Sequence, residues 1–245
     1  MWGAADYERV ARRFAPIHDE LVSSLEPAGG VRWLDLATGT GEIALRAARA
    51  GAAVTGADIS ERLLEQARAK GAAESLEVVW ELADAQDLPY ADGAFDVVSS
   101  SFGVIFAPDQ EAVARELARV ARGRLGLTCW RPNEGPHAIY ERFWPSDEVQ
   151  GADDWGSEEH VMELLSPAFE LEFEEGVWHL TGESPEDLWE VMTEGAPPVK
   201  ALVATLEPDV LAEFRRAMLE HWAGFRTDDG VDEPRRYLLV GGKRR

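Results

Sequence analysis

The sequence predicts an α/β fold built on a doubly wound, mostly parallel sheet. Along residues 31–130, short apolar runs alternate with segments whose apolar residues recur at helical spacing, and strands that alternate with helices pair in parallel. A second observation agrees with this fold, because the apolar run 32–36 breaks at Gly39 and Gly41 and continues into a helical pattern. A third is Asp58, an acidic residue that ends the next apolar run.

The first half of the chain divides into regular elements. Residues 1–30 predict two short helices, because Tyr7, Phe14 and Leu21 fall at helical spacing and Pro16 interrupts the pattern. Ser60 is suited to cap the helix that follows the second strand. The predicted strands cover 31–37, 53–58, 76–82, 95–100 and 124–130, and the predicted helices between them cover 42–50, 61–70 and 109–121.

The second half is less regular. Residues 131–156 predict an irregular connection with one helix around 138–143, and Ser184-Pro185-Glu186-Asp187 has the pattern of a helix N-terminus. Further helices are predicted over 157–165, 184–193 and 209–225, partial strands over 169–174 and 177–180, and a final strand over 236–241. This is more material than a plain sheet needs, so it is either a substrate cover or packing.

Length and composition limit the function classes. The 245 residues suit one domain, divided into an N-terminal helical cover (1–30), a cofactor-binding core (31–130), a substrate-side elaboration (131–235) and a final strand (236–245). A net charge of −22 disfavours nucleic acid and anionic membranes as partners. No apolar run reaches the length of a membrane span, and the N-terminus lacks signal-peptide features, so we expect a cytoplasmic protein. The single cysteine, Cys129, excludes an internal disulfide.

The glycine turn has two interpretations. Gly39-Thr40-Gly41-Glu42-Ile43-Ala44 satisfies the dinucleotide fingerprint, with Asp58 17 residues after Gly41. However, Asp35 precedes the turn within the strand, where its charge would oppose a pyrophosphate. S-adenosylmethionine has no phosphate, and its sulfonium and ammonium groups would favour an acid here. A third possibility is that Asp35 only fixes its own loop.

Four segments are expected to meet at the carboxyl edge of the sheet, where open α/β folds bind ligands. Asp58 can accept hydrogen bonds from ribose hydroxyls, and Ile59 can cover one face of a base. Asp84 can accept a hydrogen bond from an adenine amino group, while the backbone N–H of Ala85 can donate to a ring nitrogen. The other two segments are the turn 35–41 and residues 99–103.

At this point the sequence resembles the class I S-adenosylmethionine-dependent methyltransferases, in particular the ubiquinone/menaquinone-biosynthesis-like group of small-molecule enzymes. The resemblance implies a Rossmann-like sheet of seven strands with the last one antiparallel, S-adenosylmethionine as cofactor, and Tyr7 and Phe14 on helices that cover it. The matching segments are Leu34-Asp35-Leu36-Ala37-Thr38-Gly39-Thr40-Gly41, Gly56-Ala57-Asp58-Ile59-Ser60, Asp84-Ala85-Gln86-Asp87-Leu88-Pro89-Tyr90, Phe95-Asp96-Val97-Val98, 102–109 and 116–120. The resemblance weakens beyond residue 131, where substrate choice would reside.

We therefore expect transfer of a methyl group to a small molecule by direct displacement, with alignment rather than a dedicated catalytic residue as the main contribution. The alternatives are an NAD(P)-dependent oxidoreductase and an inactive cofactor-binding scaffold. His137 is either a base near the acceptor or a solvated loop histidine, and no metal site is expected. The sequence leaves open the oligomeric state, the acceptor, and whether carbon, nitrogen or oxygen is methylated. The expected cofactor contacts are Tyr7, Asp35, Ala37, Gly39, Gly41, Asp58, Ile59, Asp84, Ala85 and Ser101.

Overall fold

The computed structural model describes residues 12–144 and 154–245. Within these ranges the strands form one sheet in the order β3-β2-β1-β4-β5-β8-β6, and the short β7 pairs with β8. β1 to β5 run parallel, whereas β8 is antiparallel to both of its neighbours β5 and β6. The strands are β1 (Arg32–Leu36), β2 (Ala53–Asp58), β3 (Val78–Leu82), β4 (Phe95–Ser101), β5 (Ala121–Trp130), β6 (Phe169–Gly182), β7 (Arg226–Thr227) and β8 (Gly230–Arg244).

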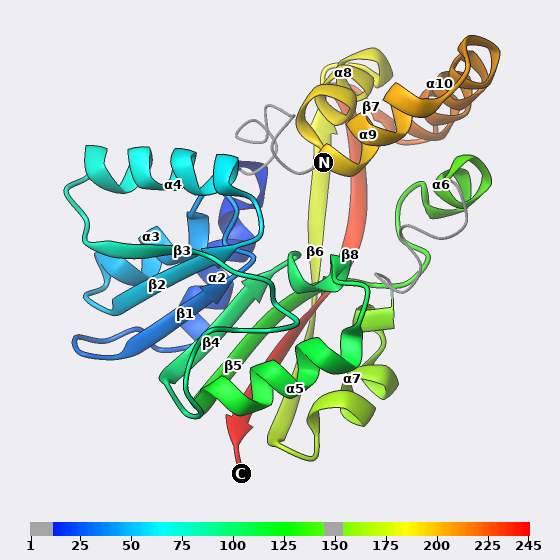
Figure 1. Cartoon of the computed structure of the whole chain (residues 1–245). Helices are drawn as coiled ribbons and strands as arrows, with labels where there is room; N and C mark the ends of the chain where they lie inside the picture. Colours follow the sequence, from blue (N-terminus) through cyan, green and yellow to red (C-terminus); the bar gives the residue numbers. More distant parts are fainter. Residues whose placement is uncertain (1–11, 145–153) are drawn as a thin grey trace.

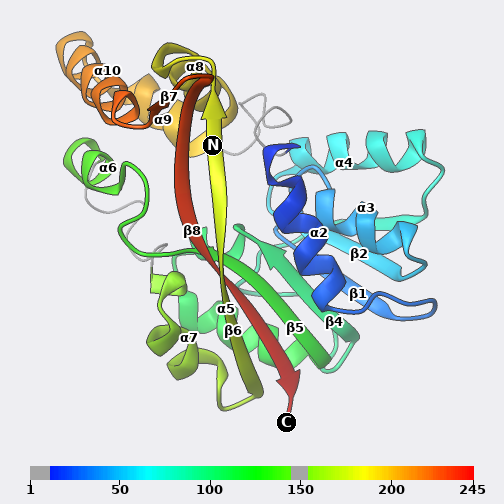
Figure 2. The same ribbon diagram turned by 180° about the vertical axis from the view of Figure 1, so that it is seen from behind.

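Helices cover both faces of this sheet, as the two opposite views show (Figure 1, Figure 2). One face packs α2 (Ala15–Ser24) and α3 (Glu42–Arg49), and the other packs α5 (Gln110–Val120) and α7 (Glu158–Leu165). The remaining helical segments are η1 (Arg12–Phe14), α4 (Glu61–Ala73), η2 (Val104–Phe106), α6 (His137–Phe143), η3 (Asp154–Gly156), α8 (Pro185–Gly195), α9 (Pro197–Thr205) and α10 (Pro208–Ala223). The doubly wound α/β fold is therefore confirmed.

The central strand β1 divides the two cores. Trp33 faces the core beside α2 and α3, while Leu34 and Leu36 face the core beside α5, and all three are buried. Strands buried on both faces read as continuous apolar runs, which is why this strand was clear in the sequence. β2 and β4 lie on either side of β1, so the order of strands reverses there and opens a crevice at the carboxyl edge.

The C-terminal region departs from the sequence predictions. The segments 169–174 and 177–180 are one strand, β6, paired along its whole length with β8, which begins at Gly230 rather than at residue 236. Gly176 does not interrupt β6, since it pairs with Tyr237 of β8. The absence of a side chain makes room for the Tyr237 ring, because a Cβ at Gly176 would lie 2.2 Å from it. Helix α9 was not predicted; it begins at Pro197, and proline is well suited to a first helical turn.

The N-terminal prediction can be followed only from residue 12. Pro16 lies in the first turn of α2, where its missing N–H leaves no hydrogen bond unmade. Most of the helix predicted before it falls outside the described residues. β5 begins at Ala121 rather than at residue 124 and continues directly from α5. The boundary errors therefore concern where elements begin and end, and the parallel core is the one that the sequence predicted.

Gly56 in β2 lies under the indole of Trp80, where an added Cβ would be 2.5 Å from the ring. We expect Gly56→Ala to lower the free energy of unfolding by about 1–3 kcal/mol through overpacking. Gly241→Ala in β8 is the matched control, because its nearest neighbour would be 3.8 Å away. Urea unfolding of both variants measures the difference, and equal midpoints for Gly56→Ala and the wild type would contradict the packing argument.

Candidate functional site

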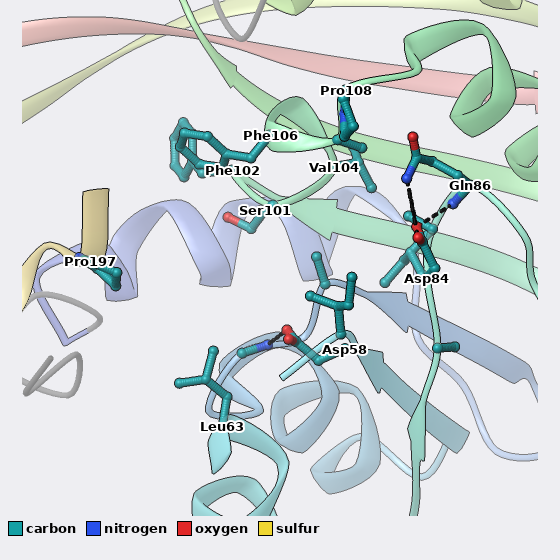
Figure 3. A pocket seen from close by; sticks show the side chains of 18 residues that line it. Asp58, Leu63, Asp84, Gln86, Ser101, Phe102, Val104, Phe106, Pro108 and Pro197 are labelled. Carbon is teal, nitrogen blue, oxygen red and sulfur yellow. Dashed lines mark hydrogen bonds between the residues drawn. The ribbon is translucent and has the colours of Figure 1, made fainter. Parts of the chain in front are cut away.

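A cavity of about 270 Å³ lies at the carboxyl edge of the sheet, around the point where the strand order reverses. Residues from the ends of β1, β2, β3 and β4 line it, together with one residue from α9 (Figure 3). Its lining consists of Leu36, Ala37, Gly39, Asp58, Ile59, Leu63, Ala83, Asp84, Ala85, Gln86, Ser101, Phe102, Gly103, Val104, Phe106, Ala107, Pro108 and Pro197.

The structure brings most of the expected contact residues to this cavity. Seven of them line it, namely Ala37, Gly39, Asp58, Ile59, Asp84, Ala85 and Ser101. Asp35 and Gly41 lie outside the lining, where they support the turn rather than face the cavity. Tyr7 lies outside the described residues.

Asp58 connects two of the elements that meet here. Its Oδ2 accepts the N–H of Gly39 at 2.8 Å, and its Oδ1 accepts the N–H of Ser60 at 2.8 Å. Burial raises the pKa of this carboxyl, although hydrogen bonds from backbone N–H groups act in the opposite direction. An ionised carboxylate has about four lone-pair sites, so Asp58 can accept further hydrogen bonds from a ligand in the cavity.

Asp84 and Ala85 follow β3 and form another side of the cavity (Figure 3). One carboxylate oxygen of Asp84 accepts the backbone N–H of Gln86 at 2.9 Å and its side-chain amide at 3.0 Å. These bonds hold the short turn after the strand. Ile59 directly follows Asp58 and is 61% exposed where it borders the cavity.

The glycine turn depends on left-handed backbone conformations. Gly39 has φ 56° and Gly41 has φ 86°, and Ala37 adopts φ 53° although it carries a Cβ. Gly41 also packs under Trp80, since an added Cβ would lie 2.7 Å from the ring. Gly103 lies against the same turn, where a Cβ would be 2.5 Å from that of Ala37. The contacts of Gly41 with Trp80 and of Gly103 with Ala37 have no signal in the sequence, because they join residues distant along the chain.

Asp35 is 1% exposed and engaged behind the turn. It accepts the hydroxyl of Thr38 at 2.5 Å, the hydroxyl of Ser99 at 2.9 Å and the N–H of Ala44 at 3.2 Å. Burial raises its pKa to about 7, although hydrogen bonds from Thr38 and Ser99 lower it. Its contacts are those of a residue that fixes its own loop, the third of the possibilities that the sequence left open.

The sequence did not predict that Phe102, Phe106 and Pro197 would line the cavity. Phe102 and Phe106 line the cavity from the β4 side, and Pro197 reaches it from α9 (Figure 3). Phe14 on η1 packs against Phe102 with ring centroids 5.4 Å apart. Sequence position gave no signal for Pro197, because it lies 95 residues after Phe102 and 156 residues after Gly41.

Other candidates lie apart from the cavity. His137 begins α6, pairs with Glu141 at 3.2 Å and does not line the cavity. Among the described residues, no group of three or more His, Cys, Asp or Glu side chains is placed to hold a metal ion. No helix in these same ranges combines the length and apolarity needed to span a membrane.

The buried carboxyl of Asp35 should make stability depend on pH. A carboxyl with a raised folded-state pKa favours the folded state at pH values below its unfolded-state pKa, near 4, and this contribution is lost as pH rises through about 7. We expect Asp35→Asn to show a smaller loss of stability than the wild type between pH 5 and pH 8. Urea unfolding across this range tests it, and parallel curves for the two proteins would contradict it.

Comparisons with known proteins agree with this geometry. Residues 34–123 match the family model described as "Methyltransferase domain". An uncharacterised Mycobacterium tuberculosis protein is 38% identical over 173 residues, which are 67% of this chain and 63% of that protein. A second one from the same organism is 34% identical over 100% of this chain and 93% of its own length.

Two further proteins have stated activities. The 27-O-demethylrifamycin SV methyltransferase of Amycolatopsis mediterranei is 45% identical over 114 residues, which are 44% of this chain and 42% of that protein. The Haemonchus contortus phosphoethanolamine N-methyltransferase 2, solved with S-adenosyl-L-methionine, shares the fold with a TM-score of 0.60 at 18% identity, over 94% of this chain and 53% of that one. The chain belongs to the class I S-adenosylmethionine-dependent methyltransferases.

Proposed function

We propose that this protein transfers the methyl group of S-adenosylmethionine to a small-molecule acceptor, with the adenosyl part of the cofactor held by Asp58 and Asp84. The cavity carries this proposal, because both acids line it at the strand reversal of the sheet. The family supports the cofactor, and the rifamycin-methylating relative supports a small molecule as acceptor. No comparison supports the nicotinamide-dependent alternative.

In this proposal each lining residue has a distinct role toward the nucleoside. The carboxylate of Asp58 accepts the two ribose hydroxyls with the lone pairs that Gly39 and Ser60 leave available. Ile59 covers one face of the adenine, which explains its large exposure in this structure. Asp84 accepts the adenine amino group, and the N–H of Ala85 donates to a ring nitrogen.

The proposed reaction needs no dedicated catalytic side chain. An electron pair of the acceptor would form a bond to the methyl carbon as the bond from that carbon to sulfur breaks, with the sulfur keeping the bonding pair as the thioether of S-adenosylhomocysteine. A proton on the methylated atom would pass to the solvent. The cofactor's sulfonium is already a good leaving group. The protein's contribution is therefore alignment of the two reactants and exclusion of water. Turnover against a chemically broad panel of methyl acceptors would separate this enzyme from an inactive cofactor-binding scaffold.

Asp58→Ala should weaken binding of S-adenosylhomocysteine by about 1.5–3 kcal/mol, because charge-assisted hydrogen bonds to two hydroxyls are lost. Asp84→Ala should weaken it less, because the backbone contact of Ala85 survives. Asp92→Ala removes the same charge in the turn before β4, where its side chain is 84% exposed, and serves as control. Calorimetric titration measures all three affinities. Unchanged affinity in Asp58→Ala would show that the ribose is held elsewhere.

Helices α8 and α9 should become less mobile when the cofactor binds. Pro197 at the start of α9 lines the cavity, so α8 and α9 are placed to close over a bound ligand. We expect backbone amides in 185–205 to exchange more slowly with deuterium when S-adenosylhomocysteine is bound. The strand β6 at the far edge of the sheet is the internal control. Protection confined to the turn 35–41, Asp58 and Asp84 would mean that this segment is only structural.

A further inference from the structure

One wall of the cavity is aromatic and lies away from the residues that we assign to the nucleoside. Phe102 follows β4, whereas Asp58 and Asp84 follow β2 and β3 on the other side of β1. Phe106 lies beside Phe102 in Figure 3, and Pro197 borders the cavity at some distance from them; these three residues form the wall. A nucleoside held by the two acids leaves this wall to the second reactant.

The ring of Phe102 is fixed from behind. It stacks on the indole of Trp130 with centroids 4.2 Å apart and planes 17° apart. Phe14 packs on the same two rings at 5.4 Å and 5.8 Å. Trp178 closes the group behind them, 4.7 Å from Phe14 and 5.6 Å from Trp130. Phe102 is the member of this cluster that lines the cavity.

The backbone of Phe102 is held in an unfavourable conformation to place that ring. Its φ is 50°, in the left-handed region that residues with a Cβ rarely adopt. The N–H of Phe102 donates to the carbonyl of Thr128 at 3.0 Å. The next residue, Gly103, has no side chain and therefore can lie against Ala37. Backbone strain of this kind persists where the surrounding structure imposes it, and it gathers at ligand sites.

The charges behind the wall indicate what can bind in front of it. Arg235 lies over the ring of Trp178 at 5.9 Å, so the aromatic cluster already has a cation of its own. That guanidinium is paired with the buried carboxylate of Glu233 at 2.7 Å. The wall residues Phe102, Phe106 and Pro197 carry no charge. The two acids of the cavity lie outside this wall, so the wall itself offers a ring face and no charged partner. An uncharged aromatic group suits it, because such a group prefers offset stacking on a fixed ring.

We propose that Phe102 determines acceptor specificity and that the acceptor presents an uncharged, planar aromatic ring to it. The acceptor ring stacks on the surface of Phe102 that faces the cavity, with the methylated atom directed toward the cofactor's sulfur. This inference rests on the proposed function, since it assigns the second substrate of the same cavity.

The test compares three probes that share one bicyclic skeleton. 2-Naphthol is planar and neutral, decahydro-2-naphthol is saturated, and 2-(aminomethyl)naphthalene is planar and cationic at neutral pH. Each is titrated calorimetrically into the protein saturated with S-adenosylhomocysteine. The saturated alcohol has at least as much apolar surface as 2-naphthol, so a pocket that selected only for apolar area would bind it at least as tightly. We expect 2-naphthol to bind about three- to tenfold more tightly than either of the others.

Phe102→Leu supplies the second arm. Leucine keeps the Cβ and hence the same backbone penalty, but it removes the aromatic face. We expect this variant to lose the preference for 2-naphthol and to bind S-adenosylhomocysteine like the wild type, whereas Phe102→Tyr keeps the preference. Phe95→Leu is the control, because Phe95 packs edge-on against Tyr90 and does not line the cavity.

The outcomes separate the two proposals. Failure of the wild type to bind S-adenosylhomocysteine would overturn the proposed function. Three results obtained while S-adenosylhomocysteine binds normally would overturn the acceptor inference and leave the proposed function intact. They are no measurable binding of 2-naphthol, tighter binding of the saturated or cationic probe, and an unchanged preference for 2-naphthol in Phe102→Leu. Loss of S-adenosylhomocysteine binding in Phe102→Leu, with an unfolding midpoint like that of the wild type, would assign Phe102 to the cofactor and overturn the acceptor inference as well.

Discussion

The hydrogen-bond network around the buried carboxyl of Asp35 fixes the part of the structure on which the cavity depends. Trp33 donates to the hydroxyl of Ser99, which donates in turn to Asp35, so β1 and β4 are joined at the point where the strand order reverses. Thr38 and Ala44 donate to the other carboxylate oxygen and hold the turn and the start of α3. Burying a polar group is costly unless it is hydrogen-bonded, and here both oxygens are satisfied.

A second buried acid, Glu233, holds α10 against the sheet. Glu233 on β8 accepts hydrogen bonds from His221 at 2.7 Å and Trp222 at 3.0 Å, both on α10, and from Arg235 at 2.7 Å. Burial would raise the pKa of Glu233, but the hydrogen bond from His221 and the charge of Arg235 lower it to about 2. The end of α10 is thereby fixed to the sheet, while α9 meets the cavity through Pro197.

The lining residues that the sequence predicted share one property, since each is the last residue of a parallel strand or lies within three residues of its end. Asp58, Ile59, Asp84 and Ala85 could be assigned to the carboxyl edge because parallel strands end there in a known direction. Asp35 shows the limit of this reasoning. Its place in the strand was predicted, but whether its side chain faces the cavity or the turn depends on Ser99, which lies 64 residues later.

The sequence by itself determined the parallel core and the glycine turn within it, and it predicted the carboxyl edge of the sheet as the place where a ligand binds. Apolar periodicity and turn chemistry are local properties, so they can be read along the chain. Only the tertiary structure decided the continuous pairing of β6 with β8, the contact of Trp80 with Gly41 and Gly56, and the aromatic wall of Phe102, Trp130 and Phe14. These contacts join segments far apart in the sequence, and side-chain packing that depends on a partner has no local signature.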